Sequence, residues 1–231
     1  MIISHKYRFI FIKTVKTAGT SVEVFLSQQC GPDDIVTPIH PHVEPHVARN
    51  FTGYFNPIPE IYSSRGQGFK DSVKQVIKRR RFYNHISALK VRSRIARTTW
   101  KNYFKFCIER NPWDKTVSHY YNERWNGTQL SFDAYLSQQQ FAGICPLNYP
   151  LYTDYQNNVL IDRIVKYENL THELREVFDL LGVPFSGSLG AKAKSEYRLN
   201  RRPYQEMYTE EQKNIVQKVF DVEIRMHGYA F

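Results

Sequence analysis

A strand, a short loop and a helix near the amino end constrain this chain more than any other feature. Residues 8–13, RFIFIK, form a short apolar run rich in Phe and Ile, which predicts a buried strand. Residues 14–19 interrupt this run, and Thr20 with Glu23 then matches a capping box at the start of a helix. The sequence therefore predicts a strand that passes through a polar loop directly into a helix.

The loop between this strand and helix contains residue types that bind phosphate. A helix start offers backbone N–H groups and a partial positive charge to an anion. Gly19 lets the backbone approach a ligand closely, and Lys16 adds a positive charge. Further hydroxyl donors come from Thr17, Thr20 and Ser21. The loop is not a Walker A motif, because its lysine precedes the glycine, and an ordinary capped turn is the alternative interpretation.

A second strand-to-helix junction carries another pair of candidate phosphate ligands. Residues 103–109 predict a strand, and Asn111 with Pro112 predicts the start of the next helix. Ser118 follows nearly two helical turns later on the same face as Asn111, and Arg110 lies beside it at the strand end. A bidentate arginine and a hydroxyl placed together would bind a second phosphate. The alternative interpretation is an Asn-Pro helix start with a surface arginine and an exposed serine.

The remaining periodic segments predict an α/β fold. Residues 163–167 indicate a third strand, and residues 30–59, with six prolines, indicate a loop. Further helices are predicted over residues 69–81, from about residue 84, and over residues 131–141, 171–182 and 209–227. Because strands alternate with helices and no linker or repeat divides the chain, we expect one domain over residues 1–231 with a central parallel sheet flanked by helices.

The positive charge of the chain is concentrated in one segment. The whole chain carries a net charge of +10, and residues 65–105 hold thirteen Lys or Arg against one Asp. Residues 1–64 are neutral, and residues 106–231 carry a small negative charge. This basic segment predicts either a surface for an anionic partner, such as a nucleotide, an acidic glycan, nucleic acid or a membrane, or only a solvated helix face.

The cysteines indicate the redox environment. Three of them lie far apart and form no CxxC pair: Cys30, Cys107 and Cys145. This pattern predicts free thiols in a reducing cytoplasm rather than disulfides.

No run of apolar residues is long enough to predict a membrane span, and residues 1–7 lack the apolar stretch and cleavage site of a signal peptide. The chain is therefore expected to be cytoplasmic.

A cluster of histidines raises the question of a metal site. His40, His42 and His46 lie with Glu44 in the proline-rich loop. Their spacing matches no familiar zinc site, so we expect no metal ligands among them.

Taken together and in this order, the two phosphate motifs resemble those of sulfotransferases that use 3′-phosphoadenosine 5′-phosphosulfate (PAPS). Residues 16–21, KTAGTS, resemble the 5′-phosphosulfate loop, and residues 110–118, RNPWDKTVS, resemble the 3′-phosphate motif. Residues 165–170, VKYENL, and residues 202–204 before the last helix resemble the carbohydrate-type branch of the family. The resemblance implies a P-loop-nucleotide-kinase-like sulfotransferase fold, and it is weakest over residues 31–83.

The resemblance also implies a role for each motif residue. Lys16 would contact the bridging oxygen of the phosphosulfate and stabilise charge on the departing phosphate. The 5′-phosphate would be held by the amides and hydroxyls of Thr17, Ala18, Gly19, Thr20 and Ser21. Arg110 and Ser118 would hold the 3′-phosphate. A loop that covers the nucleotide before the last helix would supply Lys194, Arg198 and Arg202.

His85 is the first candidate for the catalytic base. Its position before the second motif resembles that of the histidine in the family, and an unperturbed pKa near roughly 6.5 suits proton abstraction at neutral pH. A histidine at a helix start or in the core is the alternative interpretation. Glu23 is the reserve candidate, although a capping role already explains it.

The predicted activity is transfer of a sulfuryl group from PAPS to a hydroxyl or amine of a carbohydrate or other small acceptor, with release of 3′,5′-ADP. Positioning, cationic stabilisation and a base suffice for this reaction, so no metal is required, and no nucleic acid or membrane span is expected. Two alternatives remain open at this point. One is a small-molecule kinase of the P-loop type, and the other is a protein that binds nucleic acid or an anionic surface through residues 65–105.

Overall fold

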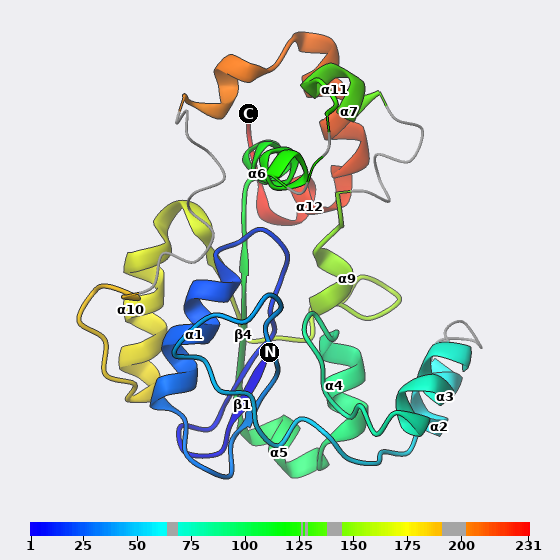
Figure 1. Ribbon diagram of the computed structural model, residues 1–231, viewed down its shortest axis with the longest axis vertical. Coiled ribbons are helices and arrows are strands. Elements are labelled where there is room, and N and C mark those ends of the chain that lie inside the picture. Colours follow the sequence, from blue (N-terminus) through cyan, green and yellow to red (C-terminus); the bar gives the residue numbers. More distant parts are fainter. Residues whose placement is uncertain (64–68, 126, 128, 138–144, 191–201) are drawn as a thin grey trace.

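The computed structural model describes residues 1–63, 69–125, 127, 129–137, 145–190 and 202–231, and Figure 1 shows their arrangement. Within these residues, the strands of one sheet are β1 Ile2–Ser4, β2 Phe9–Phe11, β3 Ile35–Val36, β4 Phe104–Glu109 and β5 Arg163–Lys166. The helices before β4 are α1 Gly19–Gln29, α2 Ile58–Ser63, α3 Phe69–Ile77, α4 Ala88–Arg94 and α5 Arg97–Asn102. Those after β4 are α6 Pro112–Trp125, α7 Phe132–Leu136, α9 Tyr149–Tyr152, η1 Tyr167–Asn169, α10 Leu170–Leu181, η3 Tyr204–Met207, α11 Glu210–Val219 and α12 Asp221–His227.

The sheet has the strand order β3-β1-β2-β4-β5 and a parallel centre. Strand β4 runs parallel to β2 on one side and to β5 on the other, whereas β1 pairs antiparallel with both β2 and β3. The predicted α/β class with a central parallel sheet flanked by helices is confirmed. The carboxyl ends of β2 and β4 lie side by side, which is where open α/β sheets bind their ligands.

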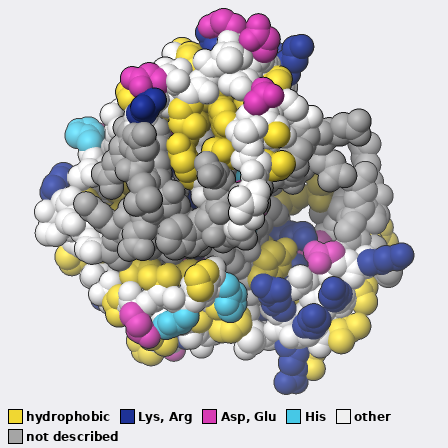
Figure 2. All heavy atoms as spheres, turned by 45° about the horizontal axis from the view of Figure 1, so that its top comes forward, with side chains coloured by type: hydrophobic (Ala, Val, Ile, Leu, Met, Phe, Trp, Pro, Cys, Tyr) yellow, Lys and Arg dark blue, Asp and Glu magenta, His cyan; other side chains and the backbone are white. Residues whose placement is uncertain are grey.

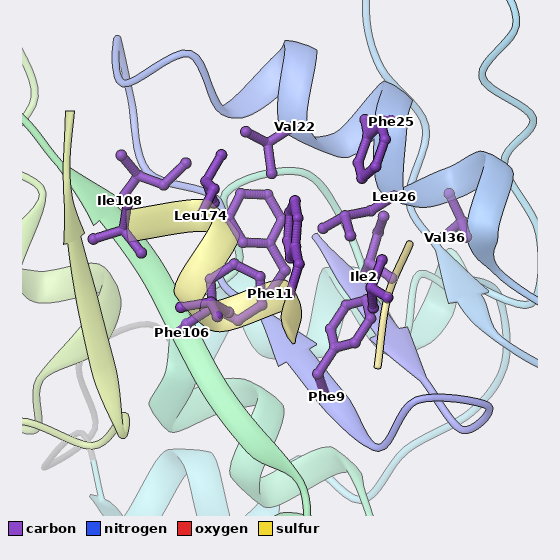
Figure 3. Close-up of a cluster of buried hydrophobic side chains, with 14 residues drawn as sticks. Ile2, Phe9, Phe11, Val22, Phe25, Leu26, Val36, Phe106, Ile108 and Leu174 are labelled. Atoms are coloured by element: carbon purple, nitrogen blue, oxygen red, sulfur yellow. The ribbon is translucent and has the colours of Figure 1, made fainter. Parts of the chain in front are cut away.

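Apolar clusters cover both faces of this sheet. On one face, Phe9, Phe11 and Phe106 pack against α1 and α10, as Figure 3 shows. On the other face, Ile10 and Cys107 pack with residues of α4 and α9. A third cluster joins α6, α7, α11 and α12 at the top of Figure 1. Together the three clusters hold each of the strands β2 and β4 against the helix that follows it. Helix α1 follows β2, and helix α6 follows β4.

Two predicted helix starts are confirmed in detail. The Oδ1 atom of Asn111 accepts a hydrogen bond from the backbone N–H of Trp113 at 3.1 Å, directly before α6 begins at Pro112. Thr209 and Gln212 form a complete capping box at the start of α11. In both places a side chain satisfies a backbone donor that the first turn leaves unpaired.

Other helix predictions need correction. The basic helix predicted over residues 69–81 ends at Ile77. The next helix starts at Ala88, because Ser87 rather than a residue near position 84 supplies the cap. The helix predicted over residues 209–227 is two helices, α11 and α12, that meet at the buried residue Phe220. In the described part of the chain, no helix has the length and apolar sequence needed to cross a bilayer.

Candidate active site

A cleft of about 1110 Å³ opens at the carboxyl ends of β2 and β4, and both predicted phosphate motifs line it. The motif residues and candidate bases on its wall are Lys16, Thr17, Ala18, Gly19, Thr20, Ser21, His85, Arg110 and Ser118. Neighbouring positions on the wall include Lys13, Asn84, Asp114, His119 and Tyr167. The volume accommodates a nucleotide together with a small acceptor, since ligand pockets usually measure about 300–1,000 Å³.

The loop between β2 and α1 has the backbone of a ligand site. Lys16 and Ala18 both adopt the left-handed conformation, with φ of 61° and 59°. For residues other than glycine this conformation costs on the order of 1 kcal/mol each, and such strain is typical of binding sites. Helix α1 begins directly after Ala18, without an acidic residue in its first turn. Its first amides can therefore bind an anion without competition from a carboxylate of the same turn.

Gly19 is required by space rather than by backbone angle. A Cβ atom at this position would lie 2.9 Å from Cγ of Lys13 and 3.3 Å from the carbonyl oxygen of Thr14. Because Lys13 is buried and ion-paired, its side chain has little room to move away. Close packing of the start of α1 against the residues that follow β2 thus explains the glycine.

Residues far along the chain hold this loop in place. Asn148 pairs with the backbone of Val15 in both directions: its Oδ1 accepts from the N–H at 2.9 Å, and its Nδ2 donates to the carbonyl at 3.1 Å. Arg110 donates to the carbonyl of Lys16 at 3.1 Å. The hydroxyl of Thr14 donates to a carbonyl of β4. These bonds give the loop a fixed shape without help from a ligand.

Asn148 is itself held by a buried polar network beneath the cleft. Its Nδ2 also donates to Glu109 Oε1 at 2.9 Å, and its backbone N–H donates to Glu223. Glu223 forms a fully buried ion pair with Lys115, at 2.7 Å. Burial raises the pKa of Glu109 to about 7, although the positive charge of Lys115 opposes this rise. The loop therefore depends on charges that sequence analysis did not single out.

The capping box predicted for Thr20 and Glu23 is wrong. Ala18 is the residue before α1, without a side-chain hydrogen bond to the first turn. Glu23 is fully buried, and its carboxylate instead accepts from Nζ of Lys13 at 2.7 Å and from the Met1 amino group. Burial alone would raise the pKa of Glu23, but these positive charges lower it to about 2. A carboxylate bound in this way is a poor proton acceptor, which removes Glu23 as the reserve base.

Arg110 and Ser118 lie on the same wall of the cleft, as predicted from their spacing. The Arg110 guanidinium makes two contacts of 2.8 Å with Asp114 and lies over the ring of Tyr167, 4.1 Å from its centroid. Together with the bond to the Lys16 carbonyl, these contacts fix its orientation. A guanidinium has more N–H donors than these contacts use, so it can still bind a phosphate beside Asp114.

His85 lies on the cleft wall as a neutral imidazole. Its Nδ1 is 3.0 Å from the carbonyl oxygen of Lys13. Burial, followed by the positive charge of Lys13, lowers the pKa of His85 to about 4, so the expectation of an unperturbed pKa near 6.5 is wrong. Because a carbonyl only accepts, Nδ1 must carry the ring proton, which leaves the lone pair on Nε2. This tautomer can accept a proton from a substrate.

His119 is a buried residue of α6 that also lines the cleft. Its Nδ1 lies 2.9 Å from the hydroxyl of Tyr135. Burial lowers the pKa of His119 to about 4, and the charges of Lys16 and Lys115 act in the same direction while Glu123 opposes them. No local pattern marks this histidine, because its burial comes from α7 packing over α6.

Acid should destabilise the folded chain through His119. Its pKa is lower in the folded state than in the unfolded chain, so only the unfolded chain takes up this proton between about pH 6.5 and 4. Relative to His119→Asn, the wild type should lose up to roughly 3 kcal/mol of unfolding free energy across that window. Urea denaturation of both proteins at several pH values measures the difference, and parallel curves would contradict the buried neutral state.

The residues predicted to cover the nucleotide are Lys194, Arg198 and Arg202. Lys194 and Arg198 lie outside the described residues. Arg202 is exposed and is not among the described residues that line the cleft.

In the histidine cluster, His42 and His46 bond to backbone carbonyls at 3.0 and 2.9 Å. Within the described chain, no three His, Cys, Asp or Glu side chains are grouped as a metal site.

Comparison with known proteins shows that the chain is similar in sequence to an archaeal protein. No protein-family model matches it. A protein of Archaeoglobus fulgidus, described as uncharacterized, is 37% identical over 98 residues, which are 41% of this chain and 80% of the archaeal protein. The chain belongs to the family of this archaeal protein. It also has a distant likeness to the crystal structure of a sulfotransferase from Alicyclobacillus acidocaldarius, with a TM-score of 0.41 and 18% identity over 91% of this chain and 94% of the other. Because this likeness is weak, the chemistry of the cleft has to be argued from the residues that form it.

Proposed function

We propose that this chain is a PAPS-dependent sulfotransferase, which transfers a sulfuryl group to a hydroxyl or amine of a carbohydrate or other small acceptor. The observation that supports this proposal best is the meeting of the two phosphate motifs in one cleft. They lie on neighbouring parallel strands, and Arg110 of the second motif donates to the carbonyl of Lys16 in the first. A donor with a 5′-phosphate and a 3′-phosphate on one ribose needs two anion sites in one cleft.

The cleft wall offers suitable partners for both ends of that donor. The first-turn amides of α1 and the hydroxyls of Thr20 and Ser21 would bind the 5′-phosphate. The hydroxyl of Thr17 lies 2.8 Å from that of Thr14, so we assign it to the loop itself, and Thr17 would contribute its amide. Arg110 and Ser118 would bind the 3′-phosphate. Cytoplasmic PAPS held by these residues would present its activated sulfuryl group to the acceptor.

The chain's own groups can carry the transfer. An acceptor oxygen or nitrogen forms a bond to sulfur as the bond from sulfur to the bridging oxygen breaks, and that electron pair leaves with the phosphate of 3′,5′-ADP. Lys16 stabilises the charge that grows on the bridging oxygen. Nε2 of His85 takes the proton that the acceptor loses. Each of these groups acts by position and charge, so the reaction needs no bound metal.

Binding of 3′,5′-ADP in the absence of magnesium is the most direct test of the donor site. At a concentration of about one hundred times its Kd, the nucleotide should stabilise the chain by about 2.7 kcal/mol. For a chain of this size, that corresponds to a rise in Tm of roughly 5–10 °C in a thermal-shift measurement. The rise should exceed that produced by ATP, with or without magnesium.

Ser118→Ala provides the matched control for this experiment. It should reduce the shift caused by 3′,5′-ADP while leaving that of 5′-AMP unchanged, because only the first nucleotide carries a 3′-phosphate. A larger shift with magnesium and ATP than with 3′,5′-ADP would favour a kinase and reject the proposed donor.

A further inference from the structure

Helix α3 leaves part of its apolar stripe exposed. Val73 and Ile77 lie with the lysines at positions 70, 74 and 78 along one shallow groove. Ile77 is 76% exposed and Val73 is half-buried, whereas Ser72 is buried and donates to Glu60 of α2 at 2.9 Å. A surface helix normally buries its whole apolar stripe. Ile77 of α3 departs from this rule.

The neighbouring helix α2 also exposes apolar side chains. It packs against α3 and exposes Ile58 by 54% and Tyr62 by 82%. Large apolar side chains exposed together on neighbouring elements usually mark a site of interaction. Figure 1 places α2 and α3 at one corner of the molecule, away from α6 and the top of the sheet.

The same corner is strongly basic. The outer side of α3 and the residues after it expose Lys70, Lys74, Lys78, Arg79 and Arg80. Figure 2 shows lysine and arginine side chains gathered on this side of the molecule, with apolar side chains among them.

The acidic residues of α2 and α3 do not neutralise this outer face. Glu60 pairs with Arg94 of α4 at 2.5 Å, in the interior of this corner. Asp71 pairs with Lys90, also of α4, at 3.1 Å. Both carboxylates therefore fix α2 and α3 to the body of the protein, and the lysines of the outer stripe keep their positive field toward solvent.

We propose that α2 and α3 form a docking surface for an anionic lipid membrane. Ile77, Val73 and Tyr62 would enter the boundary between headgroups and acyl chains, and the lysines would extend their charged ends to the lipid phosphates. The combination of apolar and basic residues on one helix face selects this partner. An acidic glycan or a nucleic acid would use the lysines, but it would gain nothing from an exposed isoleucine between them. This inference does not depend on the reaction proposed for the cleft.

Sedimentation with lipid vesicles tests the docking surface directly. The wild-type chain should bind phosphatidylcholine vesicles that contain phosphatidylserine, should bind vesicles of phosphatidylcholine alone at least tenfold more weakly, and should dissociate as salt is added. Lys74→Glu and Ile77→Ser should each weaken binding roughly fivefold or more. Both positions are exposed, so neither change should alter the fold, which thermal denaturation can verify.

Leu180→Ser is the matched apolar control, since Leu180 is 69% exposed on α10, on the other side of the molecule from α3 in Figure 1. It should leave vesicle binding unchanged. The proposal is overturned if the chain fails to bind the anionic vesicles, or if Ile77→Ser binds them as well as the wild type does. Heparin or RNA binding that is weakened by Lys74→Glu and unaffected by Ile77→Ser, without vesicle binding, would identify a polyanion as the partner instead.

Discussion

Replacing Lys16 by methionine is expected to reduce PAPS-dependent sulfation by roughly 10²–10³-fold, the usual effect of removing one preorganised charge from a transition state. Methionine keeps the length of the side chain and has the same backbone cost in the left-handed conformation that Lys16 adopts. The variant should therefore fold normally and lose only the charge that we propose acts on the bridging oxygen. Turnover of radiolabelled PAPS with a panel of saccharide acceptors measures the effect.

Lys101→Met is the matched control for this loss, because Lys101 is an exposed lysine on α5 and is not among the described residues that line the cleft. Its turnover should equal that of the wild type. Unchanged thermal stability of Lys16→Met would show that the loss is chemical. If Lys16→Met retained turnover within about tenfold of the wild type, the assignment of Lys16 to the departing phosphate would fail.

Replacing Lys115 by methionine is expected to cost about 3–5 kcal/mol of unfolding free energy, because it leaves Glu223 buried without its positive partner. Burial alone would lower the pKa of Lys115, but Glu109 and Glu223 raise it, so the ammonium group is the positive centre of the network. For a chain of this size, Tm should fall by roughly 10 °C or more. Calorimetry or urea denaturation gives the value.

The double variant Lys115→Met with Glu223→Gln separates charge from packing. If the unpaired carboxylate causes the loss, neutralising Glu223 should restore part of the stability. Lys101→Met serves as the control here as well, and it should change the unfolding free energy by no more than about 0.5 kcal/mol, as expected for a surface position. A loss of less than about 1 kcal/mol in Lys115→Met would mean that the buried ion pair contributes little to stability.

The sequence predicted the parts of the fold that carry a repeating local pattern. The strands around Phe9 and Phe106 are apolar runs bounded by turn residues, and the capped helices α6 and α11 begin where their side chains dictate. Strands β1 and β3, with three and two residues, are too short for such a pattern. Their antiparallel pairing is therefore fixed by packing in the folded chain, which no window of sequence reveals.

In the candidate site, too, the residues of local motifs could be predicted and those with distant partners could not. Each phosphate motif is contiguous, so its residues could be found in the sequence, and the parallel pairing of β2 with β4 brings the two motifs into one cleft. Glu23 was misassigned because its partner Lys13 lies between β2 and α1, outside the helix, where a helix pattern does not reach. His119 and Asn148 were missed because their environments are formed by distant segments.

The long-range bonds of the phosphate loop also bear on how the chain folds during its synthesis. The loop's partners follow it by 72 positions for His85, by 94 for Arg110 and by 133 for Asn148. When only the first motif has been synthesised, the residues that hold the loop in its folded backbone conformation are still missing. Such non-local contacts form late and slowly. We expect the binding shape of the loop to form only after residue 148 has left the ribosome, so a nascent chain shorter than this should not retain nucleotide.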